Sequence, residues 1–342
     1  MKVAVLIALL FGVQFLRSQD IHFSLFEQAP QLLNPGSTGL FDGYERAMLL
    51  NKKQWAVMGQ PYQTSYLSFD MPIFKAKRKR TSHLGVGGFL FNDKAGDANF
   101  RQFNSGISLA SHLPISSNQM FSLGLQFGVG QLSADLTQIQ WGNQYNGAGY
   151  DPSMNPMENL DMQRKVYADV SAGLVYSYQS RTSHFQGTEK REFQVGISTY
   201  HLNKPNYSFS GRTDEKLARR FTFYTSGHFA LSNMPFSLKP QLYLNFQSGQ
   251  IESLFGTYAI YHINAGTKFT GFITEKSIHF GLHYRVKDAV IPSLYYEYSN
   301  FLIGFAYDIN TSSYKSSTSG RGGAELSLKY IGKIGALRKQ RR

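Results

Sequence analysis

The chain has 342 residues and no cysteine, which excludes disulfides, thiolate nucleophiles and cysteine-based metal sites. Charged residues make up only 17%, against about 25% in a typical soluble domain, while aromatic residues reach 15%. The net charge is +13, but much of the excess lies in the run Lys75–Arg80 and in residues 333–342. A nucleic-acid-binding protein would spread basic residues and exposed aromatic residues over one face, so we expect no nucleic-acid partner.

The N-terminus has the pattern of an export signal. Lys2 precedes the apolar run Val3–Phe11, and cleavage near Ser18 would leave Gln19 as the first residue. We therefore predict a signal peptide over residues 1–18. The alternative is an uncleaved anchor helix, but the run is shorter than the roughly 18 apolar residues that a spanning helix needs.

Residues 19–43 contain several residues that interrupt regular structure. These residues are Pro30, the sequence Asn34-Pro35-Gly36 and Gly39. We predict an N-terminal periplasmic or plug segment here, with Asn34, Pro35 and Gly39 as its turn residues. The sequence leaves open whether this segment fills the lumen of a barrel or hangs below it.

From residue 44 onward, apolar residues alternate with small or polar residues. Phe121–Gly130 and Phe236–Gln247 are clear examples, and successive side chains of a strand point to opposite faces. These segments have the roughly 9–11 residues that a tilted membrane-spanning strand needs. A soluble β-sandwich is the alternative, but its strands average about 5–6 residues and its water-facing side is more highly charged.

We predict an all-β fold, a transmembrane antiparallel up-and-down β-barrel of about 14 strands over residues 44–332. The predicted strands span 44–58, 62–71, 83–93, 99–113, 119–134, 165–179, 190–203, 217–231, 236–249, 253–263, 277–287, 289–299, 301–310 and 321–332. Residues 333–342 form a basic C-terminal tail whose role the sequence leaves open.

The predicted connections differ between the two ends of the barrel. With a periplasmic N-terminus, short turns follow the even strands, and the longer loops 135–164, 204–216 and 311–320 face outside. Loop 135–164 is the candidate partner-binding surface, because aromatic residues among Asn and Gly are favoured at recognition surfaces. The alternative is a solvated loop that packs over the barrel mouth. The candidate residues are Trp141, Tyr145, Asn146, Tyr150, Asp151 and Pro152.

Several ionisable side chains fall on the inward face of the predicted strands. Buried charges are costly unless they are paired or hydrated, so we predict a polar network that closes the pore. His279 and His283 lie roughly 13 Å apart along a strand and lack a third ligand nearby, so no metal site is predicted. We also predict no catalytic residue, no cofactor and no enzymatic activity. The predicted network comprises Asp169, Lys239, His279, His283, Arg285, Glu325 and Lys329.

Short motifs are distributed along nearly the whole chain after the signal. They include His22-Phe23-Ser24, Leu33-Asn34-Pro35, Gln54-Trp55, Asp70-Met71-Pro72-Ile73, Tyr167-Ala168-Asp169-Val170, His201-Leu202-Asn203-Lys204-Pro205, Ala306-Tyr307-Asp308-Ile309-Asn310 and Glu325-Leu326-Ser327-Leu328. In order and spacing they resemble the PorP/SprF family of type IX secretion and gliding-associated outer-membrane proteins of Bacteroidetes. The chain departs from the family at Gly36, where Ala is usual.

The resemblance implies a non-enzymatic outer-membrane barrel that is needed for the export and surface attachment of large adhesin-like cargo. The implied partners are the C-terminal domain of a secreted surface adhesin, the periplasmic ring and motor components of type IX secretion, and outer-membrane lipid. An alternative is a fatty-acid-transporter-like barrel that moves small hydrophobic solutes, since such barrels also have fourteen strands and an N-terminal hatch with an Asn-Pro motif. A continuous apolar tunnel would favour that alternative, whereas a polar, plugged lumen would favour the secretion role.

Overall fold

The computed structural model describes residues 20–54, 61–75, 81–96, 98–136, 139–157, 163–184, 187–208, 215–231, 234–264, 276–312 and 315–332. The predicted signal peptide, the basic tail and most of the run Lys75–Arg80 lie outside these ranges. Within the described residues, no helix has the length and apolar character needed to cross a bilayer.

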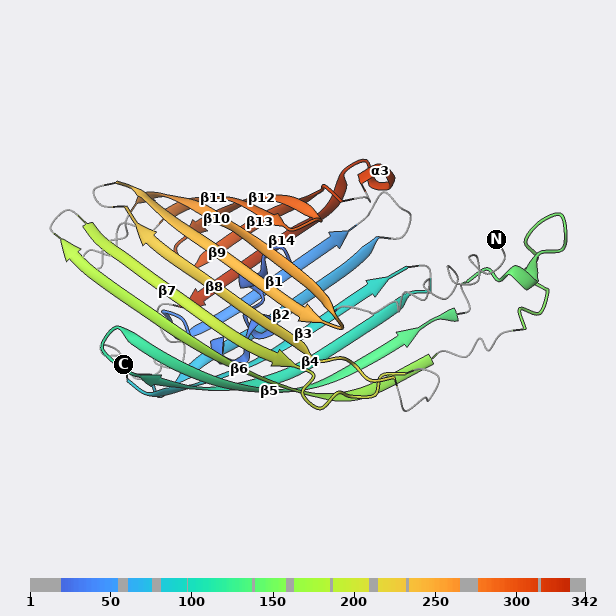
Figure 1. The fold of residues 1–342 in the computed structure, drawn as a ribbon, viewed down its shortest axis with the longest axis horizontal. Coiled ribbons are helices and arrows are strands. Elements are labelled where there is room, and N and C mark those ends of the chain that lie inside the picture. The colour runs from blue at the N-terminus through green and yellow to red at the C-terminus, as the bar shows by residue number, and fades with distance from the viewer. Residues whose placement is uncertain are drawn as a thin grey trace, which may run out of the picture.

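Fourteen antiparallel strands form a single closed barrel (Figure 1), which confirms the predicted fold class. Each strand pairs with its neighbours in sequence, and β1 pairs with β14 to close the cylinder. The strands are β1 Glu45–Gln54, β2 Tyr62–Ile73, β3 His83–Ala95, β4 Phe100–Pro114, β5 Gln119–Ala134, β6 Gln163–His184, β7 Gly187–Tyr200, β8 Arg220–Ala230, β9 Phe236–Gln247, β10 Gln250–Asn264, β11 Lys276–Arg285, β12 Ala289–Tyr298, β13 Phe301–Asn310 and β14 Arg321–Gly332.

The alternation in the sequence corresponds to the two faces of the barrel wall. In β5, Phe121, Leu125 and Phe127 are exposed on the outer face, whereas Ser122 and Gln126 are buried on the inner face. Large apolar side chains on an outer wall are the surface that acyl chains solvate, and enclosed polar side chains suit a barrel interior.

The two ends of the barrel differ in their connections. We call the end that holds the connections β5–β6, β7–β8 and β13–β14 the loop end, and the opposite end the turn end. Loop-end connections include the short helices η4 (Gly142–Gln144) and α3 (Lys315–Thr318). At the turn end, only Ser299 and Asn300 separate β12 from β13.

Several predicted strand boundaries differ from those in the structure. β6 and β7 continue as a paired hairpin to the partners His184 and Gly187, so the turn is shorter than expected. His201 and Lys287 were placed inside strands but follow β7 and β11, with φ of 58° and 60°. A residue in this left-handed region cannot continue an extended strand, so each marks the point where the chain turns.

The first described residues, 20–43, run through the barrel (Figure 1), and residues 23–39 are almost all buried inside it, whereas Asp42 near the turn end is exposed. This plug segment (residues 20–43) contains η1 (Phe26–Gln28), α2 (Pro30–Leu33) and η2 (Pro35–Ser37). Proline begins α2 and η2, where its missing N–H is not needed for an intrahelical bond. The segment crosses the lumen lengthwise, because Asp20 binds Gln247 at the loop end and Tyr44 follows it at the turn end.

Candidate functional site

Asn34 anchors the middle of the plug segment to the barrel wall. Its side-chain amide donates to the carbonyl oxygens of Leu174 and Ile197 at 3.0 and 2.9 Å, and its Oδ1 accepts from Gly36 N at 2.8 Å. Asn34 is fully buried, so these bonds satisfy a side chain that would otherwise be costly to bury. The predicted turn residue therefore fixes the segment against β6 and β7.

Glycines in the wall make room for this anchor. A Cβ on Gly173 would lie 2.0 Å from Asn34 Oδ1, and one on Gly124 would lie 2.3 Å from Gly36 N. Gly124 and Gly173 are direct partners of β5 and β6. The wall is therefore hollowed where the Asn34-Pro35-Gly36 turn packs against it.

A buried ion pair holds the turn-end half of the segment. Arg46 donates to both carboxylate oxygens of Asp70, at 2.8 and 2.7 Å, and also to the carbonyl of Ser37. The same Asp70 carboxylate accepts from the backbone of Gly39 at 2.6 Å. Gly39 has a φ of 74° and its Cβ position lies 2.7 Å from Gly85 Cα, so both conformation and space require glycine there.

Glu325 and Lys52 bind the loop-end half of the segment. The Glu325 carboxylate accepts from the backbone N–H groups of Ser24 and Leu25 at 2.7 and 2.9 Å. Lys52 lies 3.2 Å from the same carboxylate and donates to the carbonyl of His22 at 3.1 Å. Because Lys52 belongs to β1 and Glu325 to β14, the segment binds both strands that close the barrel.

Arg285 is the centre of the adjoining charge cluster. Its guanidinium lies 3.0 Å from Asp308 and 2.9 Å from Asp288, and its Nε lies 3.4 Å from Glu252. Asp308 accepts from the Ser24 hydroxyl at 2.6 Å, and Arg285 donates to the same hydroxyl. The cluster therefore reaches the plug segment through one serine.

The other predicted lumen residues also face inward, but they form separate contacts. Lys239 pairs with Glu27 of the plug segment, and His283 lies 3.0 Å from Gln241. His279 lies 3.4 Å from Glu297, and Lys329 is opposite Met48 in the β1–β14 register. The predicted residues therefore form several local groups, and Asp169 belongs to the one at the loop end.

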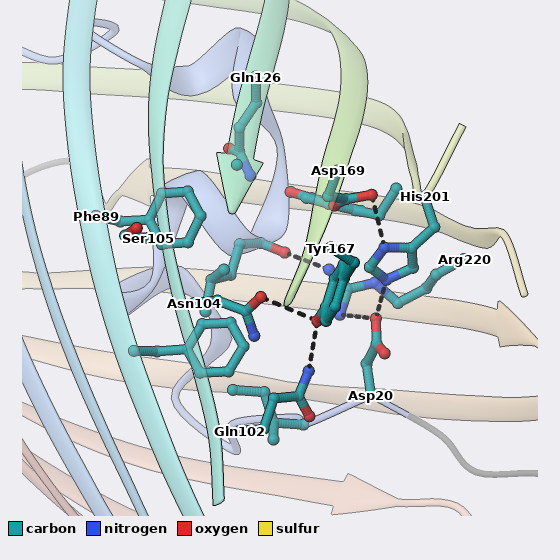
Figure 2. Close-up of a pocket in the computed structure, with 15 residues that line it drawn as sticks. Asp20, Phe89, Gln102, Asn104, Ser105, Gln126, Tyr167, Asp169, His201 and Arg220 are labelled. Atoms are coloured by element: carbon teal, nitrogen blue, oxygen red, sulfur yellow. Dashed lines mark hydrogen bonds and ion pairs between the residues drawn. The ribbon is translucent and has the colours of Figure 1, made fainter. Parts of the chain in front are cut away.

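That group is drawn in Figure 2. His201 lies between two carboxylates, with Nδ1 2.9 Å from Asp169 and Nε2 2.6 Å from Asp20. Arg220 lies 3.2 Å from the same Asp20 oxygen and stacks over the ring of Tyr200. We call Asp20, His201, Asp169 and Arg220 the loop-end latch, because they join the start of the plug segment to β6, β8 and the residue after β7.

The ionisation of the latch follows from its charges. Burial alone would lower the pKa of His201, but the carboxylates of Asp20 and Asp169 outweigh it and raise that pKa to about 9. Burial likewise opposes ionisation of Asp20, yet His201 and Arg220 hold its pKa well below the ordinary value. Near neutral pH the latch therefore holds a protonated His201 imidazole beside the ionised carboxylate of Asp20.

The lumen is not uniformly polar, which corrects the sequence-based picture of an enclosed hydrophilic interior. Phe23, Leu25 and Phe26 of the plug segment form one apolar cluster with Tyr66, Tyr243 and other wall residues. The physical reason is that the segment supplies its own apolar side chains, which the inward tyrosines cover. Two cavities beside the segment have volumes of only about 40 and 20 Å³.

The candidate partner loop forms a compact projection at the loop end. Tyr145 and Tyr150 form an isolated bridge and are 60% and 43% exposed. Asn146 accepts from Ala148 and Gly149, and Asp151 accepts from Ser153, so side chains organise both turns. Two candidates differ in exposure: Trp141 is half-buried, whereas Pro152 is exposed.

Several residues that make the contacts between the plug segment and the wall were missed by sequence reasoning. Asp20, Glu27, Lys52, Asp308 and His201 were not among the predicted site residues, although two of them fall within the family motifs. Lys52 had a usable signal, since an opposite inward charge on the last strand, Glu325, must meet it when the barrel closes. The plug-segment carboxylates Asp20 and Glu27 had no such signal, because the irregular backbone of the segment gives no periodicity from which to assign side chains to a face.

Several solved structures are similar to this chain at low sequence identity. The Pseudomonas putida toluene transporter TodX is 11% identical, with 90% of this chain and 94% of that chain covered and a TM-score of 0.43. BamA of Haemophilus ducreyi lacking POTRA domains 1–3 is 11% identical, with coverage of 84% and 70% and a TM-score of 0.41. A Pseudomonas aeruginosa FadL homologue is 11% identical, with coverage of 87% and 92% and a TM-score of 0.38.

No curated protein sequence matches the chain. One family model does match, that of the type IX secretion system membrane protein PorP/SprF, and it covers residues 16–330. A closed barrel with an even number of strands and an apolar outer wall is the form in which bacterial proteins span the outer membrane. The protein is thus an outer-membrane β-barrel, and the chain belongs to the PorP/SprF family of type IX secretion system membrane proteins.

Proposed function

We propose that this barrel is a non-enzymatic accessory of type IX secretion that holds specific large adhesin-like cargo at the cell surface through the cargo's C-terminal domain. Membership of the PorP/SprF family supports the link to the secretion machinery. Its partners in this proposal are the cargo domain on the loop-end side and the periplasmic ring and motor components on the turn-end side.

The observation that carries the proposal is the occupied lumen. The plug segment is bound at the loop end by the latch, in the middle through Asn34, and at the turn end through Asp70. A conduit for solutes or for an unfolded polypeptide needs a continuous free path. The plug segment blocks that path, and these contacts hold it in place at three levels. A filled barrel is suited to holding a partner at its surface.

The alternative of a hydrophobic-solute transporter has less support. It needs an apolar tunnel, whereas the cavities beside the plug segment hold little more than one or two waters. The larger cavity is also lined by charged groups, including Asp169 and Arg220. Nothing in the described lumen therefore favours passage of an apolar solute.

We assign cargo contact to the projecting loop around Tyr145 and Tyr150. Exposed tyrosines give a large contact area at low conformational cost, and aromatic anchors carry much of the binding energy at interfaces. The bonds made by Asn146 and Asp151 order the loop before any partner binds, which lowers the cost of association.

The test is recovery of partners from gently solubilised outer membranes with the full-length barrel as bait. We expect the wild-type barrel to retain the C-terminal domain of a large surface protein. Y145A/Y150A should reduce that recovery by about tenfold or more, because aromatic hot spots are each worth roughly 2 kcal/mol. The matched control, I115A/M234A, removes two exposed apolar side chains at the turn end and should leave recovery unchanged.

Two contrary outcomes are distinguishable. If the wild-type barrel retains only lipid, the cargo-holding function is wrong. If cargo is retained equally by wild type and Y145A/Y150A, the function stands and the assignment of the loop is wrong.

A further inference from the structure

Basic residues form a row across the outer face of neighbouring strands at the loop end. The register runs from Lys53 of β1 to Gln63 of β2, Lys94 of β3 and Arg101 of β4, each opposite the next. It continues through Ser133 of β5 to Arg164 of β6. Neighbouring strands lie about 4.8 Å apart, so this basic row concentrates four positive charges within roughly 25 Å and includes no acidic residue.

The centre of the row is electrostatically unfavourable for the protein alone. Lys94 and Arg101 are direct cross-strand partners on the same face, and like charges in that position are destabilising. The structure gives none of Lys53, Lys94 and Arg101 an ion pair with another described residue. The nearby Asp93 points the other way, because it accepts from Thr64, which is buried on the inner face. An external anion would relieve this repulsion.

The position of the row relative to the apolar band indicates what kind of anion fits. Two residues further into the wall, the outward positions of the six strands hold Asn51, Ser65, Asn92, Phe103, Gln131 and Val166. The next rows are formed largely by Leu49, Leu67, Leu90, Phe69, Ile107 and Phe127. Along these strands the outer wall therefore changes from apolar rows, through one row of mixed polar and apolar residues, to the basic row. A lipid changes in the same order, from acyl chains to polar linkage to headgroup.

The turn end of the same strands has no such row. Near the turn end, the outward faces of β2, β3, β4 and β5 instead carry the apolar residues Met71, Leu84, Leu113 and Phe121, and β1 and β5 end outward in Glu45 and Gln119. On the outward strand faces the basic row therefore lies at the loop end, although the run Lys75–Arg80 supplies further basic residues to the connection between β2 and β3 at the turn end. For a barrel with short periplasmic turns, the loop end is the outer-leaflet side.

We propose that the basic row binds the phosphate groups of an outer-leaflet lipid whose headgroup is a phosphorylated sugar. Lys and Arg are the side chains that recognise phosphate, and each contributes about fivefold to binding near a charged membrane surface. A lipid fits better than free phosphate, because the acyl chains of a bound lipid would lie on the apolar rows directly below. The proposal is independent of the cargo-holding function, since it uses only the outer wall.

The first experiment needs no variant. The full-length barrel in a neutral detergent is titrated with bisphosphorylated lipid A, with the same lipid after removal of its phosphates, and with inorganic phosphate, and bound copies are counted by native mass spectrometry. We expect the phosphorylated lipid to bind at least tenfold more tightly than the dephosphorylated one. Its binding should weaken between 50 and 500 mM salt, and millimolar inorganic phosphate should not displace it.

The second experiment tests the row itself. K53Q/K94Q/R101Q should weaken lipid A binding by about 100-fold if the three contributions add. The control K204Q/K216Q/K315Q removes the same charge from exposed loop-end residues outside the row and should change binding less than twofold. Heat-dependent mobility on gels checks that both variants are folded barrels.

Three results would overturn the proposal. They are equal binding of dephosphorylated lipid, displacement by inorganic phosphate alone, and unchanged affinity in folded K53Q/K94Q/R101Q. If that triple variant does not fold, the comparison of the two lipids on the wild-type barrel still decides.

Discussion

At the scale of single residues, the fit between the plug segment and the wall depends on glycines, which have no Cβ atom. Gly173 lacks the Cβ that would overlap Asn34 Oδ1 at 2.0 Å, and the amide of Asn34 then reaches two wall carbonyls. A wall glycine costs some backbone entropy, but here it allows a buried amide to be satisfied. Small residues of the wall therefore determine where the segment can bind.

G173A should displace Asn34 from the wall. Asn34 is fully buried, so losing its bonds together with the steric clash should destabilise the docked segment by about 2–4 kcal/mol. Hydrogen exchange of residues 30–38 in the intact barrel should increase accordingly. G88A is the control, because its Cβ would meet nothing closer than 3.4 Å. Equal exchange in both variants would show that the Asn34 anchor does not hold the segment.

At the scale of elements, the plug segment is attached by chemically different contacts along its length. The middle contact, at Asn34, is neutral, whereas the loop-end latch depends on a protonated histidine. The two should therefore respond differently to pH.

The latch should weaken in alkaline solution. The folded-state pKa of His201 is raised to about 9 from an unfolded value of 6.5. Its stabilisation is therefore fully present below about pH 6.5 and is lost as the pH rises through about 9. A shift of this size corresponds to about 3 kcal/mol. Hydrogen exchange of residues 20–25, corrected for the intrinsic pH effect, should accelerate between pH 7 and 10.

Two comparisons isolate the histidine. Residues 34–38 should keep their protection over the same pH range, because no titrating histidine side chain holds Asn34. H201Q should abolish the pH response of residues 20–25. Persistence of that response in H201Q would assign it to another group.

At the same scale, some strands could be predicted from the sequence, whereas the contacts of the plug segment could not. Strand 301–310 and strand 321–332 were predicted with the observed bounds, because the polar pair Ser299-Asn300 precedes the first and the Ser-rich residues 311–320 separate the two. Lys52 and Glu325 were not paired, because that contact exists only once the first and last strands meet. His201 was misplaced, since nothing in its neighbours reveals a positive φ. Periodicity therefore predicts faces and spans, whereas contacts of the irregular plug segment need the closed structure.

At the scale of the whole molecule, the filled lumen has a measurable electrical consequence. In planar bilayers the wild-type barrel should show no stepwise ion current, because the plug segment crosses the aqueous path. Deleting residues 20–33 should produce steps, since this removes Phe23, Phe26 and the Asp20 carboxylate of the latch. The control is deletion of residues 143–149, which lie in the projecting loop. This variant should also show no stepwise ion current. Steady currents through the wild-type protein would contradict the occupied lumen.

The binding of one segment by both closing strands bears on the order of assembly. If β1 and β14 joined first, Lys52 and Glu325 would be enclosed before the backbone of Ser24 and Leu25 arrived to complete their bonds. Enclosing a carboxylate with too few donors is costly, whereas an unjoined sheet keeps it in water. The lower-energy route is therefore one in which the N-terminal residues settle against the open sheet and the cylinder then shuts around them. Assembly of the barrel would accordingly end with the plug segment already inside it.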